Sequence, residues 1–482
     1  MKEKQTTIDI DYSESAVPKG ERRSLLTMFM IMLGFTFFSA SMWAGQELAD
    51  GLDFAGFMGA LILGGVILGL YTGLLGYVGA DSGLSLDLLA RKAFGSKGSY
   101  LPSAMISFTQ IGWFGVGIAM FAIPVADELL GGSVAAEWAL VILAGICMTA
   151  SAYFGIKSLT IISYIAVPLV AILGTVAMVL AVSRGDGTFI DQFAKSSGTL
   201  TVIGGAGLVI GSFVSGGTAT PNFTRFAKNG WVGAITTVVA FFLGNSLMFF
   251  FGAVSSIYAG GNDIFEVMIN LGLFYMAVLV LGLNIWTTND NALYSAGLGL
   301  ANIFGQKKKP MVLISGIIGT VASVWLYWNF CGWLNILNCT LPPVGIILVL
   351  SYFLNREDYQ NTEVTRVVNW YAVVGVVLGA VVANLVSWGI ASLNGMVIAS
   401  ICYLAGHLGQ FTRNYTQTVK RAADNKRRYA PGWVHSTCLL RGFPKGAAPH
   451  LAHDFAEQSV VCYTLCRRCP ENTVAAGEGK GI

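Results

Sequence analysis

Charged residues are scarce in this chain of 482 residues. Asp, Glu, Lys and Arg make up only 11% of it, and hydrophobic residues make up 54%, whereas soluble domains carry roughly 25% charged residues. So few charges cannot cover the surface of a soluble globule, but a surface that faces lipid needs none. The scarcity therefore excludes a water-soluble protein and predicts a polytopic membrane protein. A net charge of only +3 also leaves no basic patch for nucleic acid.

Histidine is rare, with 4 residues, and the 8 cysteines are mostly dispersed. Up to residue 423, the cysteines lie far apart on apolar segments, and His407 is the only histidine. Neither a disulfide framework nor a metal site is predicted there. The polar segment 413–482 is predicted to be a disordered cytoplasmic tail. A zinc site in this tail is the alternative, but the spacing of its candidate ligands fits no standard finger or ribbon; these ligands are Cys462, Cys466 and Cys469, with His450 and His453 upstream.

Apolar runs recur along the chain with the length of about 20 residues that crosses roughly 30 Å of hydrocarbon. They lack the alternating pattern of an outer-membrane barrel. The predicted fold is therefore all-α, with twelve transmembrane helices in a domain that covers 25–412. The predicted spans are 25–44, 54–78, 100–126, 136–154, 159–183, 200–220, 232–258, 271–298, 311–328, 332–353, 368–389 and 394–412.

Basic residues between the spans predict the orientation of the chain. Lys and Arg fall almost entirely on one side of the membrane, and the opposite side receives only Arg184 and Lys195. Because cytoplasmic loops carry the excess of basic residues, both termini are predicted to be cytoplasmic. Residues 1–24 then form a cytoplasmic N-terminal segment.

Four stretches with several polar residues or glycines interrupt the predicted spans, at 34–41, 110–117, 211–221 and 284–291. Such stretches are tolerated at bilayer depth only where they line a cavity or pack on protein. They occupy the first, third, sixth and eighth spans, so each pair is five spans apart. An odd offset inverts the topology, which predicts a five-plus-five inverted repeat with a site at its interface near the midplane of the membrane. The repeats would cover about 25–183 and 200–353, followed by two additional helices in 368–412.

The sixth span allows two interpretations. Gly216 and Gly217 lower helix propensity and Pro221 lacks a backbone donor, which predicts a discontinuous helix. Ser212 and Ser215 could then bond the freed backbone groups or a ligand. The alternative is a face of small residues that lets two helices approach closely.

In the eighth span, Asn284, Thr287 and Thr288 share one face of the helix. Two hydroxyls and a carbonyl there, with carbonyls freed in the first span, would form an all-oxygen nest suited to a hard monovalent cation. The alternative is that the threonine hydroxyls bond the carbonyl one turn earlier. Asp290, a carboxylate inside the hydrocarbon region, is either a proton carrier or an anchor for neighbouring polar groups.

In the third span, Gln110 and Trp113 are three residues apart and point the same way. An indole face stacks on a flat conjugated ring, and a carboxamide offers a donor and an acceptor to the edge of that ring. The pair predicts a slot for a planar heterocycle, with Phe213 as the opposite wall. The alternative is a packing tryptophan beside an amide that bonds across helices.

The chain resembles the nucleobase–cation symporters over about residues 20 to 415. Long strings carry this resemblance: GFTFFSASMW at 34–43, TQIGWFGVG at 109–117, MFAIPV at 120–125, AFFLGNSLM at 240–248 and LGLNIWTTNDNALY at 281–294. The resemblance implies a leucine-transporter-type fold and alternating access coupled to sodium or protons. It implies import of cytosine across a bacterial inner membrane with Na⁺ as coupling ion. A proton-coupled symporter of another nucleobase is the alternative.

The resemblance also assigns roles to individual residues. Trp113 and Phe213 would sandwich the base, and Gln110 would bond its polar edge. Further substrate contacts would come from Ser212, Ser215 and Asn289. The implied Na⁺ ligands are the carbonyls of Gly34, Phe37 and Asn284 and the hydroxyls of Thr287 and Thr288.

Rival classes fit the sequence less well. A transporter of amino acids or amines would require charge recognition, and no Lys or Arg lies in the predicted spans. An ion channel would require a symmetric filter or rings of charge. An enzyme would require a nucleophile with a base, or a metal cluster, so no enzymatic activity and no cofactor beyond the coupling ion are expected.

Overall fold

The structure is a computed structural model that describes residues 11–193, 196–259, 264–329, 339–360, 364, 366–386 and 388–428. The chain divides into two compact units, Met1–Gly409 and Gln410–Ile482. The site described below lies in the first unit. Within the described residues the fold is all-helical, and the only β-structure is an isolated bridge between Arg23 and Ala227. The all-α prediction is therefore confirmed for this part of the chain.

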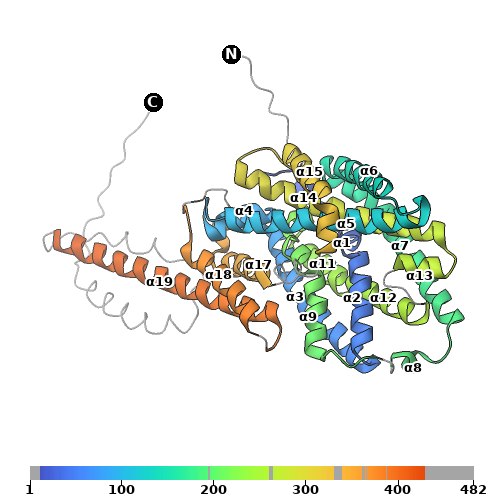
Figure 1. Cartoon of the computed structure of the whole chain (residues 1–482). Coiled ribbons are helices and arrows are strands. Elements are labelled where there is room, and N and C mark those ends of the chain that lie inside the picture. The colour runs from blue at the N-terminus through green and yellow to red at the C-terminus, as the bar shows by residue number, and fades with distance from the viewer. Residues whose placement is uncertain are drawn as a thin grey trace, which may run out of the picture. The chain divides into compact units, whose positions relative to one another are not determined.

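The helices follow one another with short connections (Figure 1). In chain order they are η1 (Lys19–Glu21), α1 (Leu25–Thr36), α2 (Ser39–Gly51), α3 (Phe54–Ser82), α4 (Leu86–Phe94), α5 (Tyr100–Leu130), α6 (Val134–Tyr153), α7 (Ile156–Arg184), α8 (Phe189–Phe193), α9 (Val202–Thr218), α10 (Pro221–Thr224), α11 (Gly230–Val239), the π-helical turn η2 (Ala240–Gly244), α12 (Asn245–Ala259), α13 (Ile264–Asn270), α14 (Phe274–Phe304), α15 (Lys308–Trp328), α17 (Pro342–Leu354), η3 (Arg356–Gln360), α18 (Trp370–Leu385) and α19 (Ala391–Arg428).

Seven of the described helices are long and apolar enough to cross a membrane, and the bent pair α1 and α2 raises this to eight. Three shorter apolar helices, α9, α17 and α18, lie in further predicted spans. Part of the predicted span 332–353 falls outside the described residues. The polytopic helical architecture is confirmed in this way, whereas the count of twelve helices and the inverted repeat stay predictions.

The tail differs from the prediction near its start. Helix α19 continues to Arg428, so residues 413–428 are helical and not disordered. The sequence there is rich in Arg and Lys and contains Ala422 and Ala423, residues that favour a helix because they lose little side-chain freedom in it. The candidate zinc ligands, from His450 to Cys469, lie outside the described residues.

Helix α5 is central to the first unit, because 89% of its most apolar stretch is buried, against 22% for that of α6. It lies beside α14, and α3 lies beside α9 and α11 (Figure 1). On the outer helices, large apolar side chains such as Ile146 and Ile172 are exposed. An exposed apolar surface of this kind is what a lipid environment requires.

The first predicted span is broken. Helices α1 and α2 meet at Phe37 and Phe38, whose backbones are extended, and their axes differ by 58°. The Asn284 side-chain oxygen accepts the Ser39 backbone N–H at 2.6 Å, so a side chain of α14 satisfies a donor that the break frees. The irregularity predicted for this span is therefore confirmed.

The sixth span is interrupted later than its glycines suggest. Helix α9 runs without a break through Gly216 and Gly217 and ends at Thr218, and α10 begins at Pro221. The missing N–H of proline is harmless in the first turn of a helix, which explains why α10 starts there. The two glycines serve packing, because a Cβ at Gly217 would collide with Thr72 of α3. Both interpretations thus hold, each for a different part of the segment, but Phe213 lies within a continuous helix and not in a break.

Candidate substrate and cation sites

A small cavity lies where the break between α1 and α2 meets α5, α9 and α14. Its lining contains five of the six predicted substrate residues, from α5 and α9. The remaining space is about that of one water molecule, so a bound ring requires the side chains to move apart. The lining residues are Phe35, Phe38, Gln110, Trp113, Ser212, Phe213, Ser215, Gly216, Thr288 and Ala292.

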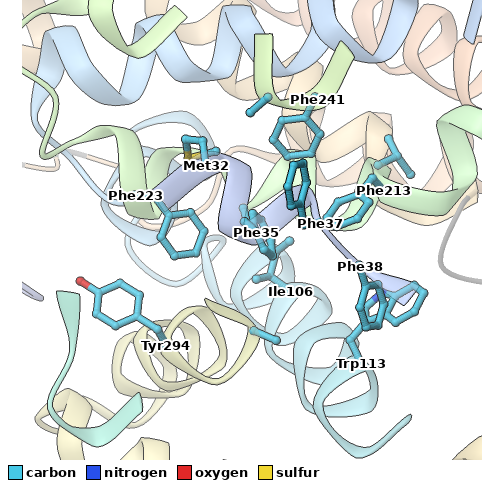
Figure 2. Close-up of a cluster of buried hydrophobic side chains, with 14 of the residues drawn as sticks. Met32, Phe35, Phe37, Phe38, Ile106, Trp113, Phe213, Phe223, Phe241 and Tyr294 are labelled. Carbon is cyan, nitrogen blue, oxygen red and sulfur yellow. The ribbon is translucent and has the colours of Figure 1, made fainter. Parts of the chain in front are cut away.

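Aromatic rings form the walls of this cavity. Trp113 and Phe213, the two walls predicted from the sequence, are both buried. Phe38 touches both of them edge-on, with ring centroids 5.5 Å from Trp113 and 6.3 Å from Phe213 (Figure 2). Phe38 was not among the residues predicted to contact the substrate. Its position directly in the break of the first span was the available signal, because an unwound segment that lines a cavity exposes its side chains to that cavity.

The polar groups of the cavity offer both donors and acceptors. Gln110 is 1% exposed, and its Nε2 has no hydrogen-bond partner among the described residues. The Trp113 indole N–H donates to Ser215 Oγ at 2.9 Å. Ser212 Oγ donates to the carbonyl of Val209 at 2.8 Å. A buried donor without a partner costs free energy, so the orphaned amide of Gln110 is the strongest local indication of a polar ligand.

Asn289 lies apart from these residues. It is fully buried in α14, but it does not line the cavity. Its amide Nδ2 donates to the carbonyl of Phe114 at 3.1 Å and contacts Met148 Sδ at 3.3 Å. These contacts connect α14 to α5 and α6. The amide Oδ1 of Asn289 is buried and has no hydrogen-bond partner among the described residues, so a substrate contact by Asn289 stays a prediction.

Two of the carbonyls predicted to hold a cation, those of Phe37 and Asn284, lie close to the hydroxyl of Thr288. Its hydroxyl Oγ1 lies 3.3 Å from the carbonyl of Phe37 and 3.4 Å from those of Phe35 and Asn284. Thr287 Oγ1 donates to the carbonyl of Asn284 at 2.9 Å. This is the bond to the carbonyl one turn earlier that was considered as the alternative to a cation site. Gly34 lies one turn before Phe37 on α1. An all-oxygen cluster of carbonyls and hydroxyls fits a hard monovalent cation.

Asp290 faces away from the cavity and toward α6. The Ser151 hydroxyl donates to Asp290 Oδ1 at 2.5 Å, and the indole N–H of Trp286 donates to Ser151 at 2.8 Å. Asp290 thus organises a polar contact between α14 and α6. This geometry agrees with the anchor interpretation of the residue.

A second buried polar cluster involves the N-terminal segment, for which no contacts were predicted. Asp11 Oδ2 and Lys308 Nζ form an ion pair at 2.5 Å, with side chains 7% and 2% exposed. Arg225, fully buried, donates to the carbonyl of Asp11 at 2.6 Å and to the hydroxyl of Tyr294 at 2.9 Å. Burial raises the pKa of nearby Asp87 to about 6, although the Ser103 hydroxyl and two guanidinium groups oppose this shift. Residues 11–12 therefore contact Lys308 of α15 and Arg225, which directly follows α10, and Arg225 in turn contacts Tyr294 of α14.

The sequence of this chain is similar to those of known permeases. Residues 16–407 match the family described as "Permease for cytosine/purines, uracil, thiamine, allantoin". The cytosine permease of Escherichia coli (strain K12) is 46% identical over 399 residues, which cover 82% of this chain and 94% of that protein. The hydantoin permease of Microbacterium maritypicum is 23% identical over 363 residues, 67% of this chain and 73% of that one.

Solved structures share the fold. A nucleobase-cation-symport-1 family transporter, in a closed conformation with bromovinylhydantoin bound, matches with a TM-score of 0.70 and 20% identity over 82% of this chain and 94% of that one. A Na⁺-coupled sialic acid symporter matches with a TM-score of 0.63 and 14% identity over 84% and 93%. With the aromatic cavity beside a broken helix, these matches show that the chain belongs to the nucleobase–cation symporter family and is a membrane permease, not an enzyme.

Proposed function

We propose that this protein imports cytosine across the cytoplasmic membrane, coupled to Na⁺, by alternating access. The observation that carries the proposal is the buried cavity in which the orphaned amide of Gln110 meets the rings of Trp113 and Phe213. A flat base requires an aromatic face for stacking and a few placed polar groups for its edge. The similarity to a cytosine permease supports cytosine as the base.

Coupling follows from structure that the two sites share. Phe37 and Phe38 are adjacent in the break of the first span: the carbonyl of Phe37 belongs to the oxygen cluster, and the ring of Phe38 belongs to the aromatic wall. A cation that orders this break also orders the wall of the substrate cavity. Because linkage is reciprocal, cytosine must then tighten Na⁺ binding by the same factor.

Movement of the substrate then requires no covalent step. With the site near the repeat interface, one half of the fold rocks against the other and exposes the cavity to each side in turn. The positive-inside bias supports cytoplasmic termini, and an inward Na⁺ gradient would drive net movement of the base into the cell.

Uptake into proteoliposomes tests the proposal. We expect radiolabelled cytosine to accumulate when an inward Na⁺ gradient is imposed, and cytosine affinity to fall on the order of tenfold when choline replaces Na⁺. Uptake driven only by a pH gradient would establish the proton-coupled alternative. An affinity that is the same in choline and in Na⁺ would contradict sodium coupling, and an absence of cytosine uptake under every gradient would contradict the substrate.

Thr288→Val tests the cation site separately. Valine keeps the shape of threonine but removes the hydroxyl at the centre of the oxygen cluster. The Na⁺ concentration for half-maximal cytosine binding is expected to rise on the order of tenfold, because one ligand is lost, while binding at saturating Na⁺ is largely retained. Thr175→Val, on the outer face of α7, is the matched control. An unchanged Na⁺ dependence in Thr288→Val would remove this residue from the site.

A further inference from the structure

A chain of hydrogen bonds approaches the substrate cavity from outside its lining. Ser41 Oγ, on α2, donates to Asn245 Oδ1 at 2.6 Å, and Asn245 Nδ2 donates to Ser212 Oγ at 3.2 Å. Ser41 and Asn245 are fully buried, and only Ser212 lines the cavity. Asn245 therefore connects α2 and α9 behind the wall of the cavity.

The direction of this chain is determined by the single hydrogen of the Ser212 hydroxyl. That hydrogen is given to the carbonyl of Val209, so the group that faces Ser212 from α12 must be a donor, the amide Nδ2 of Asn245. The amide oxygen then faces Ser41, which donates to it. A serine oxygen carries two lone pairs. One accepts from Asn245, and the other remains for a ligand.

Asn245 lies on a helix, α12, that packs tightly against α2. A Cβ at Gly45 of α2 would overlap the backbone carbonyl of Phe249, and a Cβ at Gly252 of α12 would overlap that of Met42. The two helices therefore pack backbone against backbone. Asn245 begins α12 directly after the π-helical turn η2, and such turns are frequent at functional sites. The amide is thus held by two closely packed helices and is not free to follow the ligand.

The cavity presents a defined pattern of one hydrogen-bond acceptor and one donor to a ligand. Ser212 offers an acceptor, and the orphaned Nε2 of Gln110 offers a donor. Cytosine carries an amino group at C4, which donates, whereas uracil carries an oxygen there, which only accepts. An oxygen of uracil placed against an acceptor leaves two buried acceptors facing each other, and an unpaired polar group in a dry site strongly disfavours a ligand.

We propose that Asn245 is a specificity-determining positioning residue, which fixes Ser212 as a hydrogen-bond acceptor and thereby favours an amino group over an oxo group on the bound pyrimidine. This inference rests on the proposed function, because it concerns selectivity within the same cavity. Asn245 acts through Ser212 and does not itself line the cavity.

Competition binding to the full-length protein, purified in detergent with saturating Na⁺, tests the inference. Unlabelled cytosine and unlabelled uracil each displace radiolabelled cytosine, and the ratio of their inhibition constants is measured. In Asn245→Ala the Ser212 oxygen loses the donor that holds it in place beside Val209, so the side chain of Ser212 can rotate away from the Val209 carbonyl and donate to an oxo group. The ratio of the uracil constant to the cytosine constant is expected to fall on the order of fivefold.

Ser41→Ala gives an independent second variant in case Asn245→Ala does not fold. It removes the donor that orients the amide, and Ser41 does not itself line the cavity, so the ratio is expected to fall in the same direction. The matched control is Ser246→Ala, whose hydroxyl faces Gly65 of α3 and whose loss should leave the ratio unchanged.

The outcomes separate this inference from the proposed function. A purely structural role for Asn245 would weaken both bases equally and leave the ratio constant, which overturns the inference alone. A ratio within about twofold of wild type in both variants, with cytosine binding intact, overturns it as well. A wild-type protein that binds neither base overturns the proposed function and this inference with it.

Discussion

Trp113→Ala is expected to reduce cytosine affinity by about 5- to 150-fold, the equivalent of the roughly 1–3 kcal/mol that one base–aromatic stack contributes. The substitution removes the indole wall of the cavity and also the N–H that donates to Ser215. Binding of radiolabelled cytosine to the purified protein, together with initial uptake rates in proteoliposomes, measures the effect.

Two further variants distinguish stacking from general damage. Trp113→Phe keeps an aromatic face but loses the indole N–H, so an intermediate loss is expected. Trp231→Ala removes a tryptophan that is 70% exposed, and its affinity should match that of wild type. Wild-type affinity in Trp113→Ala would show that the ring does not hold the base.

Lys308→Met is expected to lower the free energy of unfolding by about 3–5 kcal/mol, the usual cost of breaking a buried ion pair on one side. The substitution leaves the carboxylate of Asp11 buried without the ammonium that faces it at 2.5 Å. Chemical unfolding in mixed micelles, followed by tryptophan fluorescence, measures the loss.

The pair itself is tested by removing both charges. In the double variant Asp11→Asn with Lys308→Met neither charge of this pair remains without its partner, so much of the lost stability is expected to return. Lys309→Met is the control, because Lys309 is exposed beside the ring of Tyr153 and such contacts contribute at most about 1 kcal/mol. Equal stability of Lys308→Met and wild type would show that the N-terminal segment is not held by this ion pair.

The agreement between sequence and structure is best where a local pattern has one physical meaning. The scarcity of charge left no class but a membrane protein, and the spacing of Gln110 and Trp113 placed both side chains on one face of α5, where they do line the cavity. The spacing of Asn284, Thr287 and Thr288 likewise brought both threonine hydroxyls close to the carbonyl of Asn284, although the Thr287 hydroxyl donates to this carbonyl within its own helix.

The disagreements arise where several physical causes produce the same pattern. Glycines in the sixth span lower helix propensity and also permit close packing, and only the neighbouring Thr72 shows that packing is their role. Asn289 shows the same ambiguity, because its amide Nδ2 bonds the carbonyl of Phe114 while its Oδ1 has no partner among the described residues. A polar side chain in a membrane helix requires a hydrogen-bond partner, and the amino-acid sequence does not show which helix provides that partner.

By itself the sequence determined that this chain crosses a membrane as helices, that the first span contains irregular backbone, and which aromatic and hydroxyl side chains share a helix face. These properties follow from composition and from the 3.6-residue period, both of which are local. Only the tertiary structure decided that Phe38 joins the aromatic wall, that Asn245 reaches Ser212, and that Asp11 meets Lys308. Those contacts join residues far apart in the chain, and their partners are set by how the helices pack against one another.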